Sequence, residues 1–84
     1  MVYQIKLKQK AKKQLSKLPD KEFYRITETI NQLAIDPYKG KKLKGEHKGQ
    51  YSLRVWPYRI IYEIYKSFLI VVILRIGHRQ GVYK

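Results

Sequence analysis

The sequence predicts a small α+β domain with the element order β-α-α-β-β-β. Two segments in the first half of the chain have apolar residues at helical spacing, and three segments in the second half have strand-like patterns. The chain has 84 residues, 44% of them hydrophobic, which suits one domain with a thin core. We therefore expect residues 1–84 to form a single domain, in which an N-terminal strand and a helical hairpin pack on a small antiparallel sheet.

The N-terminal segment alternates between polar and apolar residues before the pattern changes. Residues 2–7 place every second, apolar side chain on one side, which is typical of a half-buried strand. From Lys8 onward the apolar residues follow helical spacing, and Pro19 ends this first helix. The apolar stripe of the helix consists of Ala11, Leu15 and Leu18.

A second helix is predicted between Asp20 and Pro37. Asp20 is a good N-cap residue, because a short carboxylate accepts hydrogen bonds from the free N–H groups of the first turn. The apolar stripe of this helix consists of Phe23, Ile26, Ile30 and Leu33. Since each helix has one apolar face, we expect the two to form an antiparallel hairpin.

Three strands are predicted in the second half of the chain. Residues 51–55 alternate, residues 58–65 alternate in part, and residues 68–76 are almost all aliphatic. Pro57 and Lys66 mark the two turns between them. The pattern predicts a three-stranded antiparallel meander, and the uniform apolarity of the last strand indicates that it lies inside the sheet.

Positive charge dominates the composition. The chain has 19 Lys and Arg against 6 Asp and Glu, a net charge of +13. Residues 36–49 combine lysines, glycines and a proline without an apolar period, so they are expected to form a basic loop. Because like charges repel within a compact state, such a protein usually meets a polyanionic partner, either nucleic acid or an acidic protein.

Composition excludes several classes of function. The sequence has no cysteine, which removes disulfides, thiol nucleophiles and the common zinc sites. The acidic residues are scattered, and His47 and His78 have no second ligand at metal-binding spacing, so we expect no metal and no other cofactor. The longest apolar stretch, residues 68–74, is far shorter than the roughly 20 residues of a membrane-spanning helix. With no signal-peptide pattern at the start, we expect a cytoplasmic protein without membrane contact.

Metal-free cleavage of RNA is a reaction that the remaining residues can support. RNA supplies its own nucleophile, the 2′-hydroxyl, so the protein needs only to hold the backbone, stabilise the transition state and transfer protons. Arginine binds phosphate through a planar fork, and tyrosine and histidine can transfer protons. The candidate catalytic residues are Arg54, Arg59, His78, Arg79 and Tyr83.

The strand patterns predict one patch for these candidates, because in an antiparallel meander the C-terminal tail, which carries His78, Arg79 and Tyr83, leaves the central strand beside its neighbours. Arg54 alternates with Leu53 and Val55, so it points to the open face of the sheet if those two face the core, and Arg59 follows the predicted turn. The candidate RNA contacts are Lys41, Lys42, Lys44, Ser52 and Trp56. Ordinary structural roles remain as alternatives. Exposed cations are commonly solvated, and His78 could be a structural residue in a turn.

Two motifs in the second half resemble a known family. The segment Tyr58-Arg59-Ile60-Ile61-Tyr62, and Gly77-His78-Arg79 followed by Val82-Tyr83, are similar to the RelE/ParE toxin superfamily of toxin–antitoxin systems, with the RelE branch fitting best. The resemblance covers the whole chain and is strongest over residues 51–84. It implies a RelE-like microbial RNase fold and a ribosome-dependent mRNA endonuclease that cuts in the A site. It also implies an acidic RelB-like antitoxin as partner, and operator DNA bound only through the antitoxin complex.

The same resemblance suggests roles for individual residues. It implies that Arg54 and Arg59 hold the scissile phosphate and that Arg79 stabilises the leaving group. Tyr83 would orient the nucleotide or handle a proton. Ser52 departs from the pattern, because some RelE-like toxins have a lysine there, and His78 could compensate for the missing cation.

Some questions stay open at the level of the sequence. The general base could be His78, Tyr83 or Glu46. A second hypothesis is the ParE branch, a toxin that inhibits DNA gyrase without cleaving nucleic acid. A third is a nucleic-acid-binding module without enzymatic activity, for which the loss of one arginine would only weaken binding and reduce its salt dependence.

Overall fold

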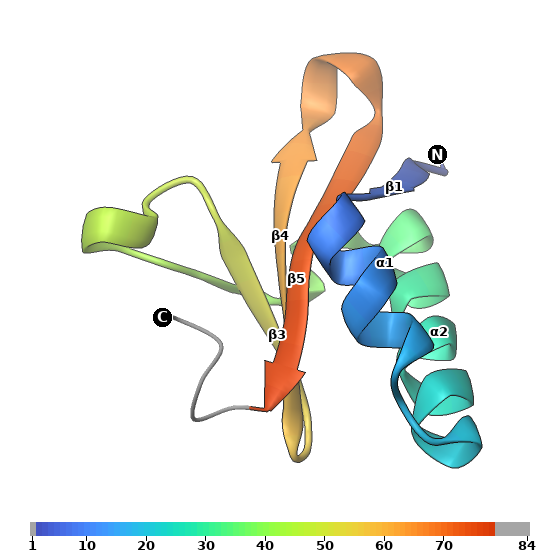
Figure 1. Cartoon of the computed structure of the whole chain (residues 1–84). Helices are drawn as coiled ribbons and strands as arrows, with labels where there is room; N and C mark the ends of the chain where they lie inside the picture. The colour runs from blue at the N-terminus through green and yellow to red at the C-terminus, as the bar shows by residue number, and fades with distance from the viewer. Residues whose placement is uncertain (1, 79–84) are drawn as a thin grey trace.

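A computed structural model describes residues 2–78 of the chain (Figure 1). The helices are α1 (Gln9–Ser16) and α2 (Asp20–Ile35). The strands are β1 (Gln4–Leu7), β2 (Lys41–Lys42), β3 (Tyr51–Val55), β4 (Tyr58–Tyr65) and β5 (Ile70–His78). The expected α+β class is confirmed, as is the order of the longer elements.

All five strands belong to one sheet with the order β1-β5-β4-β3-β2. β1 pairs with β5 in parallel, and the other neighbours are antiparallel. The predicted meander of β3, β4 and β5 is confirmed, and β5 lies inside the sheet between β1 and β4. Parallel neighbours cannot be joined by a tight hairpin, and here the chain between β1 and β5 contains the two helices and the other three strands.

The expected basic loop contains a strand that the sequence pattern missed. Lys41 lies opposite Ser52 and Lys42 opposite Tyr51, so β2 extends the sheet beyond β3. A strand of two residues is too short to show any hydrophobic period, and its pairing is set by the neighbouring strand. The expectation of an irregular segment over residues 36–49 is therefore wrong at this point.

The start of α2 also differs from the expectation. Pro19 is the N-cap residue, without a side-chain capping bond, and Asp20 is the first helical residue. The N–H of Phe23 donates to the carbonyl oxygen of Pro19, at 2.8 Å. Asp20 and Glu22 both lie in the first turn, where a carboxylate stabilises the positive end of the helix dipole without acting as a cap.

The core lies between the two helices and one face of the sheet (Figure 1). Its buried residues are Tyr3, Ala11, Ile26, Ile30, Leu33, Ile60, Tyr62, Val71, Ile73 and Ile76. No α-helix within residues 2–78 covers the other face, which we call the open face. Because side chains alternate along a strand, the open face carries Lys41, Ser52, Arg54, Arg59 and Ile61. No helix in this described part of the chain is long and apolar enough to cross a bilayer.

A bulge in β5 changes which of its residues face the core. Ile61 lies opposite Arg75, but the next residue, Tyr62, lies opposite Ile73, so β5 has one extra residue here. Ile73 is buried in the core before the bulge and Ile76 is buried after it. Strict alternation from Ile73 would have pointed Arg75 into the core, whereas the bulge places it on the open face.

Candidate nucleic-acid interface

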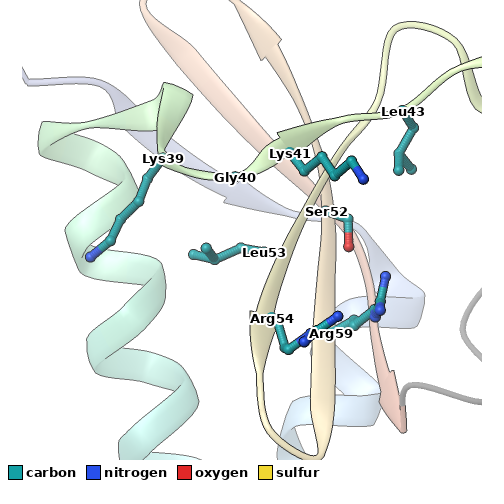
Figure 2. A pocket seen from close by; sticks show the side chains of 8 residues that line it. All are labelled: Lys39, Gly40, Lys41, Leu43, Ser52, Leu53, Arg54 and Arg59. Atoms are coloured by element: carbon teal, nitrogen blue, oxygen red, sulfur yellow. The ribbon is translucent and has the colours of Figure 1, made fainter.

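A groove of about 460 Å³ lies where β2 and the segment before it meet β3 and β4 (Figure 2). It is lined by Lys39, Gly40, Lys41, Leu43, Ser52, Leu53, Arg54 and Arg59. Figure 2 shows the side chains of Lys41, Ser52, Arg54 and Arg59 on one side of the strands, and that of Leu53 on the other. We call this the basic groove, because all of its charged lining residues are cations.

Arg54 and Arg59 form the centre of the positive charge on this face. They lie directly opposite each other on β3 and β4, an arrangement that places Cβ atoms about 4.5–5.5 Å apart. Arg54 is exposed and Arg59 is half-buried. Leu53 packs against the core, so Arg54 takes the open face as the alternation predicted. Two adjacent guanidinium groups suit a phosphate, which can accept both planar forks at once.

Ser52 lies between a cation and an apolar residue on the same face. In register, Lys41 is its neighbour on β2 and Ile61 its neighbour on β4. Ser52 is 7% exposed and Ile61 is fully buried. A small hydroxyl therefore forms part of the floor of the groove, and the positive charge comes from the residues around it.

Tyr62 fixes β2 against the rest of the sheet from below. Its buried hydroxyl donates to the carbonyl oxygen of Pro37, at 2.8 Å, and accepts from the N–H of Gly40, at 3.0 Å. Burial raises the pKa of Tyr62 to about 12. A Cβ atom at Gly40 would lie 2.4 Å from the Tyr62 hydroxyl oxygen, so only glycine fits at this position. This contact sets the position of the adjacent Lys41 in the groove.

The tip of the β3–β4 hairpin is held by α2. Arg25 donates from Nη2 to the carbonyl oxygen of Trp56, and its Nη1 lies 3.2 Å from a carboxylate oxygen of Glu22. The side chain of Trp56 is 58% exposed, and it follows the Arg54 strand by one residue. An exposed indole two residues from Arg54 is able to stack on a base.

His78 lies apart from the basic groove. It is the last residue of β5 and is paired with Tyr58, whose ring centroid is 6.1 Å from that of the imidazole in an edge-on contact. Tyr58 packs against the core, so the register places His78 on the helix side of the sheet, whereas Arg59 is on the open face. The structure thus does not bring His78 together with the two arginines. Arg79 and Tyr83 lie outside the described residues.

The candidate RNA-binding lysines divide between two hollows. Lys41 lines the basic groove. Lys42 and Lys44 line a second hollow of about 380 Å³, together with Leu43, Gly45 and Lys48. Because Lys42 is paired with Tyr51, whose ring packs on the core, it points away from the open face. A single anionic strand in the basic groove would therefore contact Lys41 directly, while Lys42 and Lys44 lie farther along the same loop.

Two cations near the candidate site were not among the sequence-based candidates. Lys39 lines the groove, and its Nζ donates to Oε1 of Gln32 at 2.8 Å. Arg75 lies on the open face, opposite Ile61. A signal for Arg75 existed, since it is the one charged residue within the aliphatic stretch 68–76.

Carboxylates are sparse on the open face. Glu63 shares this face of β4, four residues beyond Arg59, and accepts a hydrogen bond from the hydroxyl of Tyr65 at 2.8 Å. The same bond raises the pKa of Tyr65. Within residues 2–78, no three histidine or acidic side chains gather in a way that could hold a metal ion.

The fold and the basic groove define a small α+β protein with a cationic groove on the open face of its sheet. The family model described as "ParE toxin of type II toxin-antitoxin system, parDE" matches residues 5–83. The chain therefore belongs to the RelE/ParE superfamily of type II toxins, as its motifs indicated.

Individual relatives support the same assignment. The chain is 34% identical to Toxin RelG of Mycobacterium tuberculosis, over 100% of this chain and 99% of that protein. The toxin–antitoxin complex RelBE2 of the same organism contains a chain with 33% identity and a TM-score of 0.88, which covers 94% of this chain and 100% of the other. The archaeal RelE–RelB complex from Pyrococcus horikoshii matches with 28% identity and a TM-score of 0.80, over 96% and 99% of the two chains.

Proposed function

We propose that this toxin is a ribosome-dependent mRNA endonuclease that cuts in the A site without a catalytic metal. The observation that carries the proposal is the pairing of Arg54 with Arg59 at the basic groove. Two arginines side by side can hold the non-bridging oxygens of one phosphate and stabilise the charge that develops on it. Similarity to RelG and to toxins of RelE-type complexes favours this branch of the superfamily.

In the proposed reaction the 2′-oxygen of the substrate attacks the neighbouring phosphorus, and the bond from phosphorus to the 5′-oxygen breaks. A base removes the proton of the 2′-hydroxyl, and an acid protonates the leaving 5′-oxygen. The products are a 2′,3′-cyclic phosphate and a 5′-hydroxyl. We assign stabilisation of the leaving 5′-oxygen to Arg79. We assign nucleotide orientation or proton transfer to Tyr83. His78 stays a candidate for proton transfer, although its ring contacts Tyr58.

RNA contacts beyond the scissile phosphate are proposed along the same face. Lys41 and Ser52 line the groove next to Arg54, and Trp56 offers an exposed ring at the hairpin tip. Lys42 and Lys44 line the second hollow, and Lys42 points away from the open face, so these two lysines would contact RNA only beyond the edge of the basic groove. The net charge of +13 favours association with the polyanionic ribosome.

An antitoxin is the proposed protein partner. The similar chains from M. tuberculosis and P. horikoshii are parts of toxin–antitoxin complexes. An acidic, RelB-like antitoxin would neutralise the positive face of this chain, and operator DNA would be bound only through the resulting complex. Action on ribosomes would place the toxin in the cytoplasm.

A second candidate function is inhibition of DNA gyrase, because the matching family model is that of the ParE toxin. The pairing of Arg54 and Arg59 favours the nuclease, since an inhibitor that leaves nucleic acid intact does not need to stabilise a pentavalent phosphate. A supercoiling assay with purified gyrase separates the two functions.

Primer extension on mRNA bound to purified ribosomes tests the proposal. We expect cuts with the wild-type toxin, none on ribosome-free RNA, and strongly reduced cutting with Arg54→Gln, Arg59→Gln, Arg79→Ala and Tyr83→Phe. Lys66→Gln is the matched control, because it removes one exposed charge at the distant β4–β5 turn. The absence of cuts together with inhibition of supercoiling would reject the nuclease, and 3′-hydroxyl ends would reject the 2′-hydroxyl mechanism.

A further inference from the structure

Arg75 occupies an unusual place in a strand that is otherwise apolar. Residues 70–74 are all aliphatic, and Val71 and Ile73 are buried in the core. The bulge opposite Ile61 and Tyr62 resets the alternation, so that Arg75 joins the face that carries Arg59. Bulges commonly re-aim a side chain beside a functional site. Here the bulge delivers a guanidinium group to the open face.

The guanidinium of Arg75 is only partly satisfied within the described structure. Its Nε is buried and has no hydrogen-bond partner among residues 2–78, and the residue as a whole is half-buried. A buried donor without a partner costs free energy, and such a group in a native protein calls for an explanation. Because Nε itself is shielded from solvent, an anionic ligand on the open face would bind this guanidinium through its terminal nitrogens.

The register fixes the spacing between Arg75 and the arginine pair. Arg59 lies opposite Gly77, and Arg75 lies two residues before Gly77 on the same strand. Such diagonal neighbours are about 7–8 Å apart, within reach of long side chains. This is roughly the separation of successive phosphates along a single strand of RNA. Arg54 and Arg59 are too close to each other to serve two phosphates in this way.

We propose that Arg75 binds the phosphate next to the scissile one, so that the open face holds two successive phosphates of the RNA. The inference rests on the proposed function for the identity of the ligand. In this arrangement Arg54 and Arg59 bind the reacting phosphate. Arg75 binds the neighbouring phosphate and so fixes the direction and register of the RNA strand on the open face. Bidentate contacts of this kind hold a substrate in one orientation, which is what positioning for an in-line attack requires.

A chemical double-mutant cycle tests this assignment. The ligand is a short RNA that cannot be cut, because the 2′-hydroxyl at the scissile position is replaced by hydrogen. Two further versions of this RNA each carry one neutral methylphosphonate, in place of the phosphate on the 5′ side or on the 3′ side of the scissile phosphate. Affinity is measured for the wild type and for Arg75→Ala, on programmed ribosomes and with the isolated protein. Arg75→Gln replaces Arg75→Ala if the alanine variant does not fold, and Lys66→Ala controls for the loss of one charge.

We expect Arg75→Ala to weaken binding of the intact RNA about tenfold and to reduce the salt slope of binding by about one. At one of the two positions, the methylphosphonate should weaken RNA binding by the wild type by a similar factor. The same methylphosphonate should leave the RNA affinity of Arg75→Ala unchanged. The inference would be overturned if, at both positions, the loss of affinity from the methylphosphonate multiplied with the loss from Arg75→Ala. It would also be overturned if Arg75→Ala bound the intact RNA as tightly as the wild type. Equal weakening toward RNA and toward an acidic peptide, without dependence on a particular phosphate, would assign Arg75 to a protein partner and also overturn it.

The outcome is separable from that of the proposed function. If the wild type cuts ribosome-bound mRNA and Arg75→Ala cuts equally well, the endonuclease stands and the role of Arg75 falls. If the wild type does not cut at all, the endonuclease falls, and the affinity of the isolated protein for the uncleavable RNA still decides whether Arg75 contacts a phosphate.

Discussion

Arg54 on β3 and Arg59 on β4 face each other as a directly opposed cross-strand pair of like charge. Pairs of like charge in this position destabilise a sheet, by an amount comparable to the 0.2–1 kcal/mol of a favourable pair, in rough terms. The pair lies in a protein whose net charge of +13 adds further repulsion. The proposed phosphate ligand would account for this pair, because a bound phosphate converts the repulsion into attraction of both arginines to one anion.

The first prediction separates stability from function at this pair. Arg54→Gln should raise the free energy of unfolding by a few tenths up to about 1 kcal/mol, because it relieves the repulsion across the strands. The same change should weaken RNA binding and cleavage about tenfold, because it removes one charged fork from the phosphate. Urea unfolding and primer extension measure the two effects. A less stable Arg54→Gln would show that Arg54 contributes favourable contacts to the free protein.

The spacing of apolar residues along the sequence predicted those helices and strands that bury one face in the core. The stripe of α1 packs on the core, as do Ile26, Ile30 and Leu33 of the α2 stripe, whereas Phe23 is only half-buried and lies outside the core. In the aliphatic stretch 68–76, Val71, Ile73 and Ile76 lie in the core, while Phe68 is exposed. Alternation in β3 also placed Arg54 on the open face, since Leu53 packs inward. Burial of one side of a helix or strand is a local property, so it is visible in a short window of sequence.

The groove itself depends on long-range register, which no local window contains. β2 is held by its pairing with β3 and by the bond from Gly40 to Tyr62, 22 residues away. The bulge in β5 reverses the face of Arg75. The position of His78 opposite Tyr58 likewise follows from the register after that bulge. Sequence reasoning therefore identified Arg54 and Arg59 as candidates and did not identify Arg75.

Trp56 gives a second prediction for RNA binding. Trp56→Ala should weaken the binding of single-stranded RNA by about 1–3 kcal/mol, the range measured for stacking of one base on an aromatic ring, and Trp56→Phe should retain most of the affinity. The hairpin tip should stay in place, because Arg25 donates to the backbone carbonyl of Trp56, which the substitution keeps. Tyr24→Ala is the control, since Tyr24 is 71% exposed and lies on α2. An equal effect of both changes would argue against stacking at the tip.

Tyr62→Phe tests the anchor of β2. The change leaves the carbonyl of Pro37 and the N–H of Gly40 without their partner, so the free energy of unfolding should fall by about 1–3 kcal/mol. Tyr65→Phe removes a hydroxyl whose hydrogen bond to Glu63 is exposed to solvent, and it should change stability by less than about 0.5 kcal/mol. Chemical denaturation of the three proteins gives the comparison. Equal effects of the two substitutions would show that the Tyr62 hydroxyl is not an anchor.

The pKa of Tyr62 adds a prediction at alkaline pH. Burial raises it from 10.0 to about 12, so the phenol ionises more readily in the unfolded chain than in the folded one. The contribution of the neutral phenol is fully present below pH 10 and is lost as the pH rises toward about 12. The stability difference between the wild type and Tyr62→Phe should therefore shrink across this window. A difference that stays constant with pH would mean that the hydroxyl ionises equally in both states.

Gly40 is the position where a single methyl group should do most damage to the groove. A Cβ atom there would lie 2.4 Å from the Tyr62 hydroxyl oxygen and 2.9 Å from the carbonyl oxygen of Ser52. Gly40→Ala should therefore destabilise the protein by about 1–3 kcal/mol and lower cleavage by displacing Lys41. The double variant Gly40→Ala/Tyr62→Phe should lose less than the sum of the two single losses, because one of the clashing atoms is gone.

Gly45 provides the matched control for that substitution. Its φ of +67° lies in the left-handed region, and the space around its Cβ position is open. Asparagine tolerates this backbone conformation, so Gly45→Asn should cost little stability and leave cleavage near the wild-type rate. If Gly40→Ala were as harmless as Gly45→Asn, then β2 would have to move freely relative to Tyr62, and the position of Lys41 could not depend on the buried hydroxyl.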